Sequence, residues 1–399
     1  MTSLPSHIQQ RSLSPAGNGL FTIKAIDAGE EVLRIERPLV AVLNQKHLTR
    51  ACEWCFIWVS EGEGEAKTKL RACQGCRIVR YCSKTCQSSS WQHHHRHECK
   101  IFKKLYPNVL PNTVRILLQI LQRRKSKSLP NTEWQALLNL QSHIDDFRSS
   151  STKNADGLTT YQTIELMSQA LQAYSTTEEE PLSLLQSLTA TTLINALTLT
   201  TPHFDPLGLT LSPQIALLNH SCTPNTAITY SHATLSLRSL TPIPANSELT
   251  ISYIDTTHPT PTRQSELQER YFFTCACPFC CENLTNGIPE DPPINSNSDD
   301  FRARSVKAIE LQNEAATKSS PSEAYPLLSH ALDLLSPYQP TRQPYATILH
   351  SAFLTALSLQ NYPLALSHKL HEYFLIDPVH YQPDFHPGYL GKGMLVSRV

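Results

Sequence analysis

The sequence predicts an α+β fold in which strands from distant parts of one domain meet across inserted modules. Short apolar and β-branched segments occur early, at 21–42, and again late, at 227–253. A cysteine-rich stretch at 52–99 and a block with helical periodicity at 113–199 separate the two groups. Because strands must meet to bury their apolar faces, we expect a single sheet built from both groups.

Six segments have strand character and are bounded by turn residues such as Gly29 and Pro38. They are Phe21–Ile23, Glu31–Ile35, Leu39–Val42, Ala227–Tyr230, Thr234–Arg238 and Glu248–Tyr253. Four segments of the central block have the apolar periodicity of helices. They are 113–123, Trp134–Ile144, Tyr161–Tyr174 and Leu182–Leu199. The basic run that starts at Arg123 follows the first of these and predicts a solvated helix end.

The C-terminal part predicts a helical domain behind a linker. Residues 283–300 are rich in Asn, Pro, Asp and Ser, which is typical of a linker. Residues 302–336 and 342–375 have helical periodicity and predict about four paired helices.

The composition excludes several classes of protein. The 399 residues carry 34 basic and 34 acidic side chains, so the net charge gives no attraction to nucleic acid or to a membrane surface. Residues 1–14 lack the apolar core of a signal peptide, and no run of about 18 apolar residues predicts a membrane span. Twelve cysteines without a secretory signal favour metal binding in the reducing cytoplasm or nucleus. We expect a monomer with a protein partner rather than nucleic acid or membrane.

Eleven cysteines and one histidine form three groups with zinc-ligand spacing. The first eight ligands are Cys52, Cys55, Cys73, Cys76, Cys82, Cys86, His95 and Cys99, and the last four are Cys222, Cys275, Cys277 and Cys280. The long gap between Cys55 and Cys73 disfavours pairing of neighbours. An interleaved arrangement would put Cys52, Cys55, Cys82 and Cys86 on one zinc, and Cys73, Cys76, His95 and Cys99 on the other. His95 is preferred to His94 because His95 and Cys99 are one helical turn apart.

Two further segments attract attention because of their chemistry. Gly17-Asn18-Gly19 precedes the first expected strand; its glycines would let the backbone approach a ligand, although a plain turn is the simpler interpretation. The string Asn219-His220-Ser221-Cys222-Thr223-Pro224-Asn225 surrounds a zinc-ligand cysteine and is followed by Glu248-Leu249-Thr250-Ile251-Ser252-Tyr253-Ile254-Asp255.

With these motifs in this order, residues 16–282 resemble the SET and MYND domain (SMYD) lysine methyltransferases. The resemblance implies a SET-domain β fold with an inserted MYND zinc module and helical insert, a cysteine-rich post-SET segment and a C-terminal α-helical, TPR-like domain. The implied divisions are 1–51, 52–99 (MYND), 100–180 (helical insert), 181–260 (SET core), 261–282 (post-SET), 283–301 (linker) and 302–399 (helical domain).

The resemblance also implies roles for single residues. Tyr253 would be catalytic, and Tyr253 and Tyr271 would line the channel for the target lysine. The implied S-adenosylmethionine contacts are Gly17, Asn18, Gly19, His143, Asn195, Asn219, His220 and Phe273. The implied activity is methylation of histone or non-histone lysines with about three zinc ions per chain. The alternative is a zinc-dependent adaptor that binds peptides through the MYND module and has an inactive SET domain.

Two further features of the sequence carry expectations. Asn246 stands where the family has a turn glycine, and asparagine tolerates the left-handed conformation expected there. Trp54, Trp58 and Trp91 lie in the zinc module, where they either pack or line a groove for a proline-rich peptide.

Overall fold

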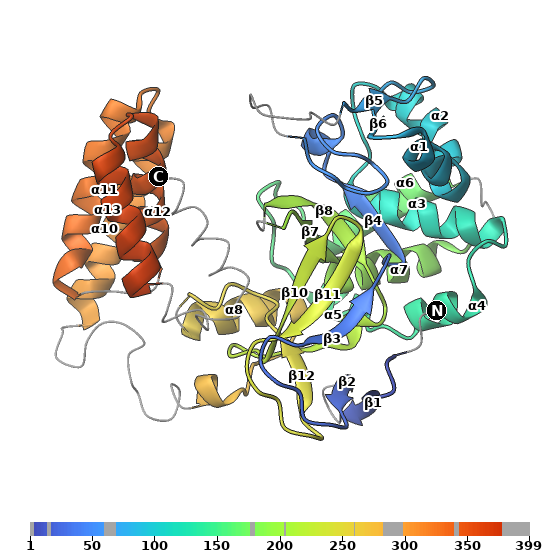
Figure 1. The fold of residues 1–399 in the computed structure, drawn as a ribbon, viewed down its shortest axis with the longest axis horizontal. Helices are drawn as coiled ribbons and strands as arrows, with labels where there is room; N and C mark the ends of the chain where they lie inside the picture. The colour runs from blue at the N-terminus through green and yellow to red at the C-terminus, as the bar shows by residue number, and fades with distance from the viewer. Residues whose placement is uncertain are drawn as a thin grey trace.

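The computed structural model describes residues 4–13, 17–59, 69–175, 180–202, 205–258, 260–281, 298–338 and 343–376. Within these ranges, Figure 1 shows a region of strands with a zinc-ligand module and helices beside it, and a helical bundle set apart at the C-terminal end. The expected α+β class, with cysteine clusters and a C-terminal helical region, is confirmed.

The strands form several small sheets, so the expectation of a single sheet is wrong. The first sheet has the order β1 (Ile8–Leu13), β2 (Gly17–Thr22), β12 (Glu248–Ile251) and β9 (Asn219–His220). The second has the order β10 (Thr226–Ser231), β11 (Thr234–Ser239) and β3 (Glu31–Ile35). The third has the order β4 (Val40–Leu43), β8 (Pro206–Leu211) and β7 (Leu197–Thr200).

Each of these three sheets nevertheless joins early strands to late ones, as the sequence predicted. Their strands have only two to six residues, and short turns separate several of them. Gly29, with a φ of 80°, makes one such turn between β2 and β3. Asn246, with a φ of 63°, adopts the left-handed conformation expected of it just before β12.

The cysteine-rich module is built from short elements that carry the expected metal ligands. It contains the 3₁₀ turn η1 (Gln45–His47) at its entrance, the two-stranded sheet β5 (Arg71–Ala72) and β6 (Arg80–Tyr81), α1 (Lys84–Ser90), the π-helical turn η2 (Trp91–His95) and α2 (Arg96–Leu105). Ser83 caps α1, because its hydroxyl accepts a hydrogen bond from the Cys86 N–H at 3.1 Å. That cap fixes the turn between two ligand cysteines.

The central block contains five helices, which are α3 (Asn112–Lys125), α4 (Asn131–Leu138), α5 (Ile144–Ser149), α6 (Thr160–Tyr174) and α7 (Leu182–Asn195). Two of the helix ends predicted from the sequence were wrong. The helix predicted over Trp134–Ile144 ends at Leu138, and His143 (φ 48°) begins a new helix in another direction. The helix predicted to reach Leu199 ends at Asn195, because the following apolar residues pair as β7 with β8.

Helix α3 is the buried centre of this block, and the first residue of its basic end departs from the predicted solvation. Arg123 is only 7% exposed and donates from Nη1 to the Leu39 carbonyl at 2.8 Å. Its neighbour Arg124 lies 3.7 Å from the ring centre of Trp134. Arg123 therefore packs against β4, whereas residues 124–127 are exposed as predicted.

The C-terminal bundle has a hydrophobic core of its own. The bundle contains α10 (Ser298–Thr317), α11 (Pro321–Leu335), η4 (Ser336–Tyr338), α12 (Tyr345–Ser358), α13 (Tyr362–His371) and η5 (Glu372–Ile376). Two further elements, η3 (Ile215–Leu217) and α8 (Thr260–Tyr271), belong to the strand region that precedes it. The four expected helices are present, but the first begins inside the predicted linker, of which 283–297 lies outside the described residues. Gln343 Nε2 donates to Thr257 Oγ1 at 3.1 Å and joins the bundle to the strand region. None of the helices in the described ranges is both long and apolar enough to cross a bilayer.

Candidate active site and metal centres

The structure brings the twelve expected ligands together as three groups of four. They are Cys52, Cys55, Cys82 and Cys86; Cys73, Cys76, His95 and Cys99; and Cys222, Cys275, Cys277 and Cys280. Within the groups, five pairs of sulfur atoms lie 3.4–4.0 Å apart. Four thiolates at 2.3 Å from one ion in a tetrahedron are about 3.8 Å apart. The three clusters therefore fit zinc in donor type, number and spacing.

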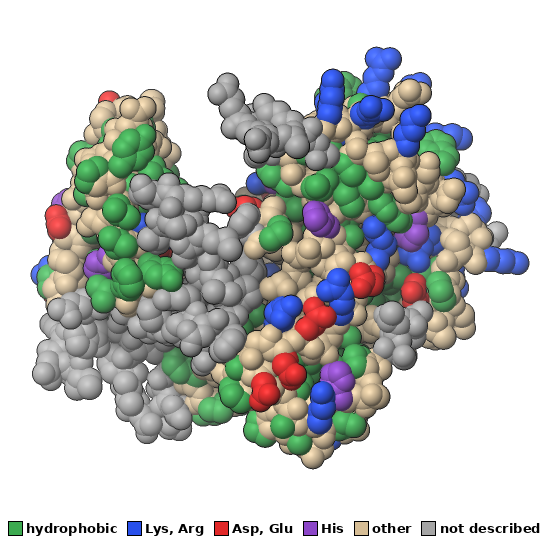
Figure 2. All heavy atoms as spheres, viewed as in Figure 1, with side chains coloured by type: hydrophobic (Ala, Val, Ile, Leu, Met, Phe, Trp, Pro, Cys, Tyr) green, Lys and Arg blue, Asp and Glu red, His purple; other side chains and the backbone are tan. Residues whose placement is uncertain are grey.

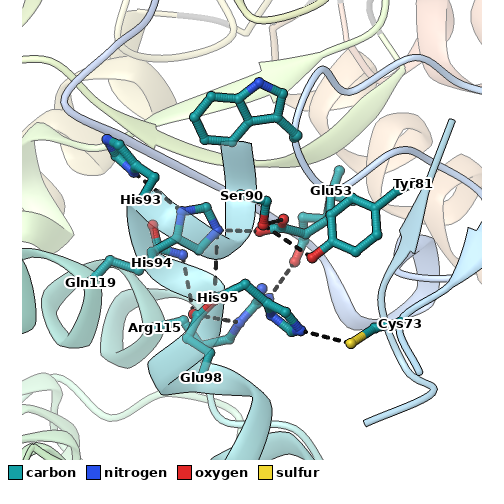
Figure 3. Close-up of polar contacts among 12 residues, drawn as sticks. Glu53, Cys73, Tyr81, Ser90, His93, His94, His95, Glu98, Arg115 and Gln119 are labelled. Atoms are coloured by element: carbon teal, nitrogen blue, oxygen red, sulfur yellow. Dashed lines mark hydrogen bonds and ion pairs between the residues drawn. The ribbon is translucent and has the colours of Figure 1, made fainter. Parts of the chain in front are cut away.

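The first two clusters are interleaved along the chain. One cluster is formed by Cys52, Cys55, Cys82 and Cys86. The other is formed by Cys73, Cys76, His95 and Cys99, so the ligands of the two clusters alternate in pairs along the chain. His95 Nε2 lies 3.3 Å from the Cys73 sulfur and 3.7 Å from the Cys76 sulfur. His94 lies outside this cluster, because it points to the opposite side of η2 toward Glu53 (Figure 3).

The region around His94 is a buried polar network that the sequence analysis missed (Figure 3). His94 Nε2 is 2.5 Å from Glu53 Oε1 and 3.8 Å from Glu98 Oε2. Ser90 donates its hydroxyl to Glu53 at 2.5 Å. Burial alone would raise the pKa of Glu53, but the charge and hydrogen bond of His94 outweigh it and hold the pKa at about 2.

This network continues into α3. Gln119 Nε2 donates to Glu98 Oε1 at 3.1 Å, and Arg115 Nε lies 3.9 Å from the same oxygen. Arg115 also donates from Nη1 to the Leu43 carbonyl at 2.7 Å, which extends the contacts to β4. Glu53, His94 and Glu98 resemble a metal-ligand set, but the 2.5 Å contact is hydrogen-bond length and Arg115 already supplies positive charge. The network therefore fastens the zinc module to the core.

One signal could have revealed this network. Arg115 is the charged residue within the apolar run of α3, and it is 2% exposed. A buried arginine needs an acceptor, and Glu98, next to the ligand Cys99, was the available carboxylate on a neighbouring helix. The sequence could not show that these two helices cross at those residues.

The third cluster joins the motif at 219–225 to the cysteine-rich segment. Cys222, Cys275 and Cys280 are each at most 4% exposed, and the Cys222 sulfur lies 4.0 Å and 3.5 Å from the other two. Gln264, on α8, binds both backbone groups of Cys275 at 2.8 Å. Tyr253, Tyr271 and Phe273 pack against the same cluster. A metal here would thus fix the aromatic residues of the expected channel.

Gly17 and Gly19 lie within β2 rather than in a turn ahead of it, which corrects the simpler interpretation. A Cβ at Gly17 would lie 2.6 Å from Gln141 Nε2, and a Cβ at Gly19 would lie 2.7 Å from Glu248 Oε1. Asn219 donates from Nδ2 to Glu248 Oε1 at 2.7 Å and to the Asn18 carbonyl at 3.1 Å. The two glycines thus leave a narrow polar cradle at this sheet.

His143 and Asn195 lie beside the same cradle through Gln141. Asn195 Nδ2 donates to the Gln141 carbonyl at 2.9 Å, and His143 Nε2 lies 3.3 Å from Gln141 Oε1. The His143 ring stacks on Phe272 with ring centres 5.5 Å apart. Among the residues expected at the cofactor site, Asn219 therefore contacts Asn18 directly, whereas His143 and Asn195 approach β2 through Gln141.

Tyr253 lies just beyond the end of β12, in an aromatic wall. Its hydroxyl donates to the Leu218 carbonyl at 2.5 Å. Its ring centre is 4.9 Å from that of Tyr271 and 6.5 Å from that of Phe273. Burial, followed by the charge interaction with Tyr271, raises the pKa of Tyr253, so its phenol is neutral at pH 7. A neutral phenol can orient a group through hydrogen bonds but is not a ready base.

His220 lies between Tyr253 and the third cluster. Its Nδ1 accepts a hydrogen bond from the Tyr253 N–H at 3.1 Å, and its Nε2 is 3.3 Å from the Cys222 sulfur. Burial lowers the pKa of His220 to about 4 despite the opposing charge of Cys277. Its ring also faces Phe273, with ring centres 6.0 Å apart.

The tryptophans of the zinc module differ in exposure. Trp54 packs under Arg37, 3.7 Å from its guanidinium carbon, and Trp58 packs edge-on against His47. Trp91 is 45% exposed. Figure 2 shows lysine and arginine side chains gathered over the zinc module, at the upper right of the view.

Comparison with known proteins gives concordant matches. A family model described as "SET domain" matches residues 17–254. The chain is 32% identical over 266 residues to SET domain and MYND-type zinc finger protein 6 of Schizosaccharomyces pombe, covering 66% of this chain and 50% of that protein. It is 29% identical over 280 residues to Histone-lysine N-methyltransferase SMYD3 of Homo sapiens, covering 70% and 62%. It is 27% identical over 345 residues to N-lysine methyltransferase SMYD2-B of Danio rerio, covering 82% and 74%. The chain spans about half to three fifths of the length of the first two relatives.

Proposed function

The chain belongs to the SET-domain family, with SMYD lysine methyltransferases among its relatives, and from this premise we propose that it is an S-adenosylmethionine-dependent protein-lysine N-methyltransferase. The observation that carries the proposal is the position of Tyr253. Its phenol is held by the Leu218 carbonyl inside an aromatic wall, and the next residue, Asn219, contacts the polar cradle of Gly17 and Gly19.

The cradle fits the proposed cofactor. Cβ atoms at Gly17 and Gly19 would fill the space between β2 and the side chains of Gln141, Glu248 and Asn219. We propose that the cofactor-binding residues are Gly17, Asn18, Gly19, His143, Asn195, Asn219, His220 and Phe273. S-adenosylmethionine would supply a methyl group on a positively charged sulfur. Three zinc ions would be held by the three cysteine clusters.

In the proposed mechanism, the protein prepares the target amine. A free lysine has a pKa of about 10.4, and transfer needs the neutral amine. Tyr271, Phe273 and Tyr253 form apolar walls that disfavour the ammonium form. The Tyr253 hydroxyl hydrogen is directed to the Leu218 carbonyl, so the phenolic oxygen is left to accept an N–H of the amine. That contact would aim the nitrogen lone pair for in-line attack.

The proposal extends to partners and domains. The partner is a protein or peptide with a target lysine, and a proline-rich peptide at Trp91 of the zinc module is a second proposed partner. The divisions proposed from the sequence are retained, with the last domain beginning at Ser298. Eleven thiolate ligands require reduced cysteines, so we place the protein in the cytoplasm or nucleus.

The test is a two-step assay on the purified chain. Calorimetry should detect binding of S-adenosylmethionine, and labelled methyl should pass to lysines in a pool of histones, cellular proteins and peptides. A chain that binds the cofactor but labels no lysine in these pools contradicts the proposal and favours the adaptor function. A chain that does not bind the cofactor contradicts both the site and the activity.

A further inference from the structure

The side chain of His220 touches two parts of the site that lie just beyond the end of the ladder between β9 and β12. Its Nδ1 lies 3.1 Å from the Tyr253 nitrogen, and its Nε2 lies 3.3 Å from the Cys222 sulfur. Tyr253 is 33 residues away in the sequence, whereas Cys222 is two residues away. One ring nitrogen of His220 therefore faces the backbone of Tyr253, the proposed catalytic residue, and the other faces the third cysteine cluster.

The hydrogen bonds define the tautomer of this histidine. A backbone N–H can only donate, so Nδ1 must carry the lone pair that accepts from Tyr253. In a neutral imidazole the single proton is then on Nε2. That proton points at the Cys222 sulfur, which as a metal-bound thiolate would be a good acceptor. Both ring nitrogens of His220 thus have a defined partner and a defined direction.

Tyr253 needs such a restraint because the sheet ends before it. The parallel ladder pairs Thr250 with Asn219 and Ile251 with His220, and its last bond runs from the Ser221 N–H to the Ile251 carbonyl at 3.0 Å. Tyr253 lies two residues past this point. Its N–H is held by the His220 side chain, while its phenol is held by the Leu218 carbonyl at 2.5 Å.

We propose that the His220 imidazole is a positioning bridge, which fixes the backbone of Tyr253 to the third cysteine cluster through Nδ1 and Nε2. The bridge rests on the proposed function only for its catalytic consequence. It makes the orientation of the phenol depend on the sulfur that the metal holds. Conversely, the Nε2–H would stabilise a metal-bound Cys222 thiolate, because a hydrogen bond to a ligand atom helps to orient that ligand.

Two amide substitutions separate the two halves of the bridge. In His220→Asn, the side-chain oxygen is placed near the Nδ1 position and can accept from the Tyr253 N–H, but nothing reaches Cys222. In His220→Gln, the amide nitrogen is placed near the Nε2 position and can donate to Cys222, but the acceptor for Tyr253 is lost. The backbone of residue 220 is unchanged in both variants.

Three measurements read the two halves. Amide hydrogen exchange at Tyr253 reports the Nδ1 bond, and we expect it to be about five-fold faster in His220→Gln than in His220→Asn. The rate at which a chelator removes the third zinc equivalent reports the Nε2 bond. We expect that rate to be about ten-fold faster in His220→Asn than in His220→Gln. Single-turnover methyl transfer at saturating cofactor should fall more in His220→Gln, by about five-fold or more.

The outcomes decide the proposal. If exchange, zinc release and methyl transfer changed equally in both variants, the His220 ring would contribute only through packing. If all three stayed at their wild-type values, neither hydrogen bond of His220 would matter. Either result contradicts the proposal. Nitrogen NMR of the wild-type histidines, assigned by the signal missing in His220→Asn, must show the proton on Nε2. A proton on Nδ1 overturns the bridge.

The bridge and the proposed function fail in different ways. Exchange, zinc release and nitrogen NMR need no methyl transfer. If the wild type labels no lysine but these three measurements behave as expected, the function is wrong and the bridge stands. If the wild type methylates lysine but the variants show no split in exchange and zinc release, the bridge is wrong and the function stands.

Discussion

Replacing Tyr253 by phenylalanine removes one hydroxyl group and almost no volume. In the structure this hydroxyl donates to the Leu218 carbonyl at 2.5 Å. The ring contacts with Tyr271, Phe273 and His220 depend on the aromatic ring and should remain. The main-chain bond from the Tyr253 N–H to His220 is also unaffected by the change.

Two effects follow from the lost hydroxyl, and they differ in size. The Leu218 carbonyl loses a donor, which should lower the free energy of unfolding by about 1–2 kcal/mol. The target amine loses the oxygen that aims its lone pair. A single oriented hydrogen bond at the reacting atom is worth about 1.4 kcal/mol or more, so transfer should fall about ten-fold or more. Cofactor affinity should change little.

Tyr230→Phe is the matched control. Tyr230, in β10, is 5% exposed, and its hydroxyl has no hydrogen-bond partner within the described part of the chain. Removing a buried hydroxyl without a partner should leave the free energy of unfolding unchanged or raise it by up to about 1 kcal/mol. Methyl transfer should stay at the wild-type rate, because this ring lies in the second sheet rather than in the aromatic wall.

The measurement is single-turnover transfer of labelled methyl at saturating S-adenosylmethionine, with urea unfolding of each variant in parallel. A Tyr253→Phe protein as fast as the wild type removes this hydroxyl from the mechanism. If Tyr230→Phe slows transfer as much as Tyr253→Phe does, the loss of activity reflects a general disturbance of the fold. That result would also refute a specific role for the Tyr253 hydroxyl.

Three further changes test the clusters and the buried network. Cys222→Ser should reduce the metal content from about three zinc per chain to about two and weaken cofactor binding, as elemental analysis and calorimetry would show; unchanged metal content contradicts the split site. Cys73→Ser should unfold the zinc module locally but leave cofactor binding detectable, because the module is inserted between β4 and β8 of one sheet; a soluble variant without binding contradicts this. Glu98→Gln should lower the free energy of unfolding by about 2–3 kcal/mol, since it removes the carboxylate beside buried Arg115. The control is Glu310→Gln, which breaks the exposed ion pair between Glu310 and Lys307 and should change the free energy of unfolding by at most about 0.5 kcal/mol. If urea unfolding showed the same loss of stability in both variants, burial would have no role.

The metal clusters were predictable because ligand spacing is local information. A Cys-x2-Cys turn directs both sulfurs to one side whatever surrounds it, and the helical spacing of His95 and Cys99 places both on one face. The structure groups all twelve predicted ligands in the expected sets. The mixing of early and late strands was predictable for a similar reason, since short apolar strands cannot be stable without partners.

The errors occurred where tertiary contacts decide local structure. Residues 197–199 continue the apolar periodicity of α7, but pairing with β8 makes them a strand. The strands β1 and β8 were not predicted, because Ile8–Leu13 is largely polar and Pro206–Leu211 begins with a proline. Arg123 looked like a solvated helix end until β4 placed the Leu39 carbonyl beside it. In each case, the decisive partner is distant in sequence.

The third cluster explains how such a divided site can be rigid. The segment between Cys222 and Cys275 contains β10, β11, β12 and α8, and with them Tyr253 and Tyr271. Closing a loop of this length costs conformational entropy in the unfolded chain, and a metal that binds only the closed form contributes its binding free energy to folding. The same ion would also define the position of the Cys222 sulfur, which the His220 side chain links to the Tyr253 backbone. Stability and orientation of the aromatic wall would thus depend on one coordination site, and this would account for a cysteine of the third cluster within the motif that contacts the polar cradle.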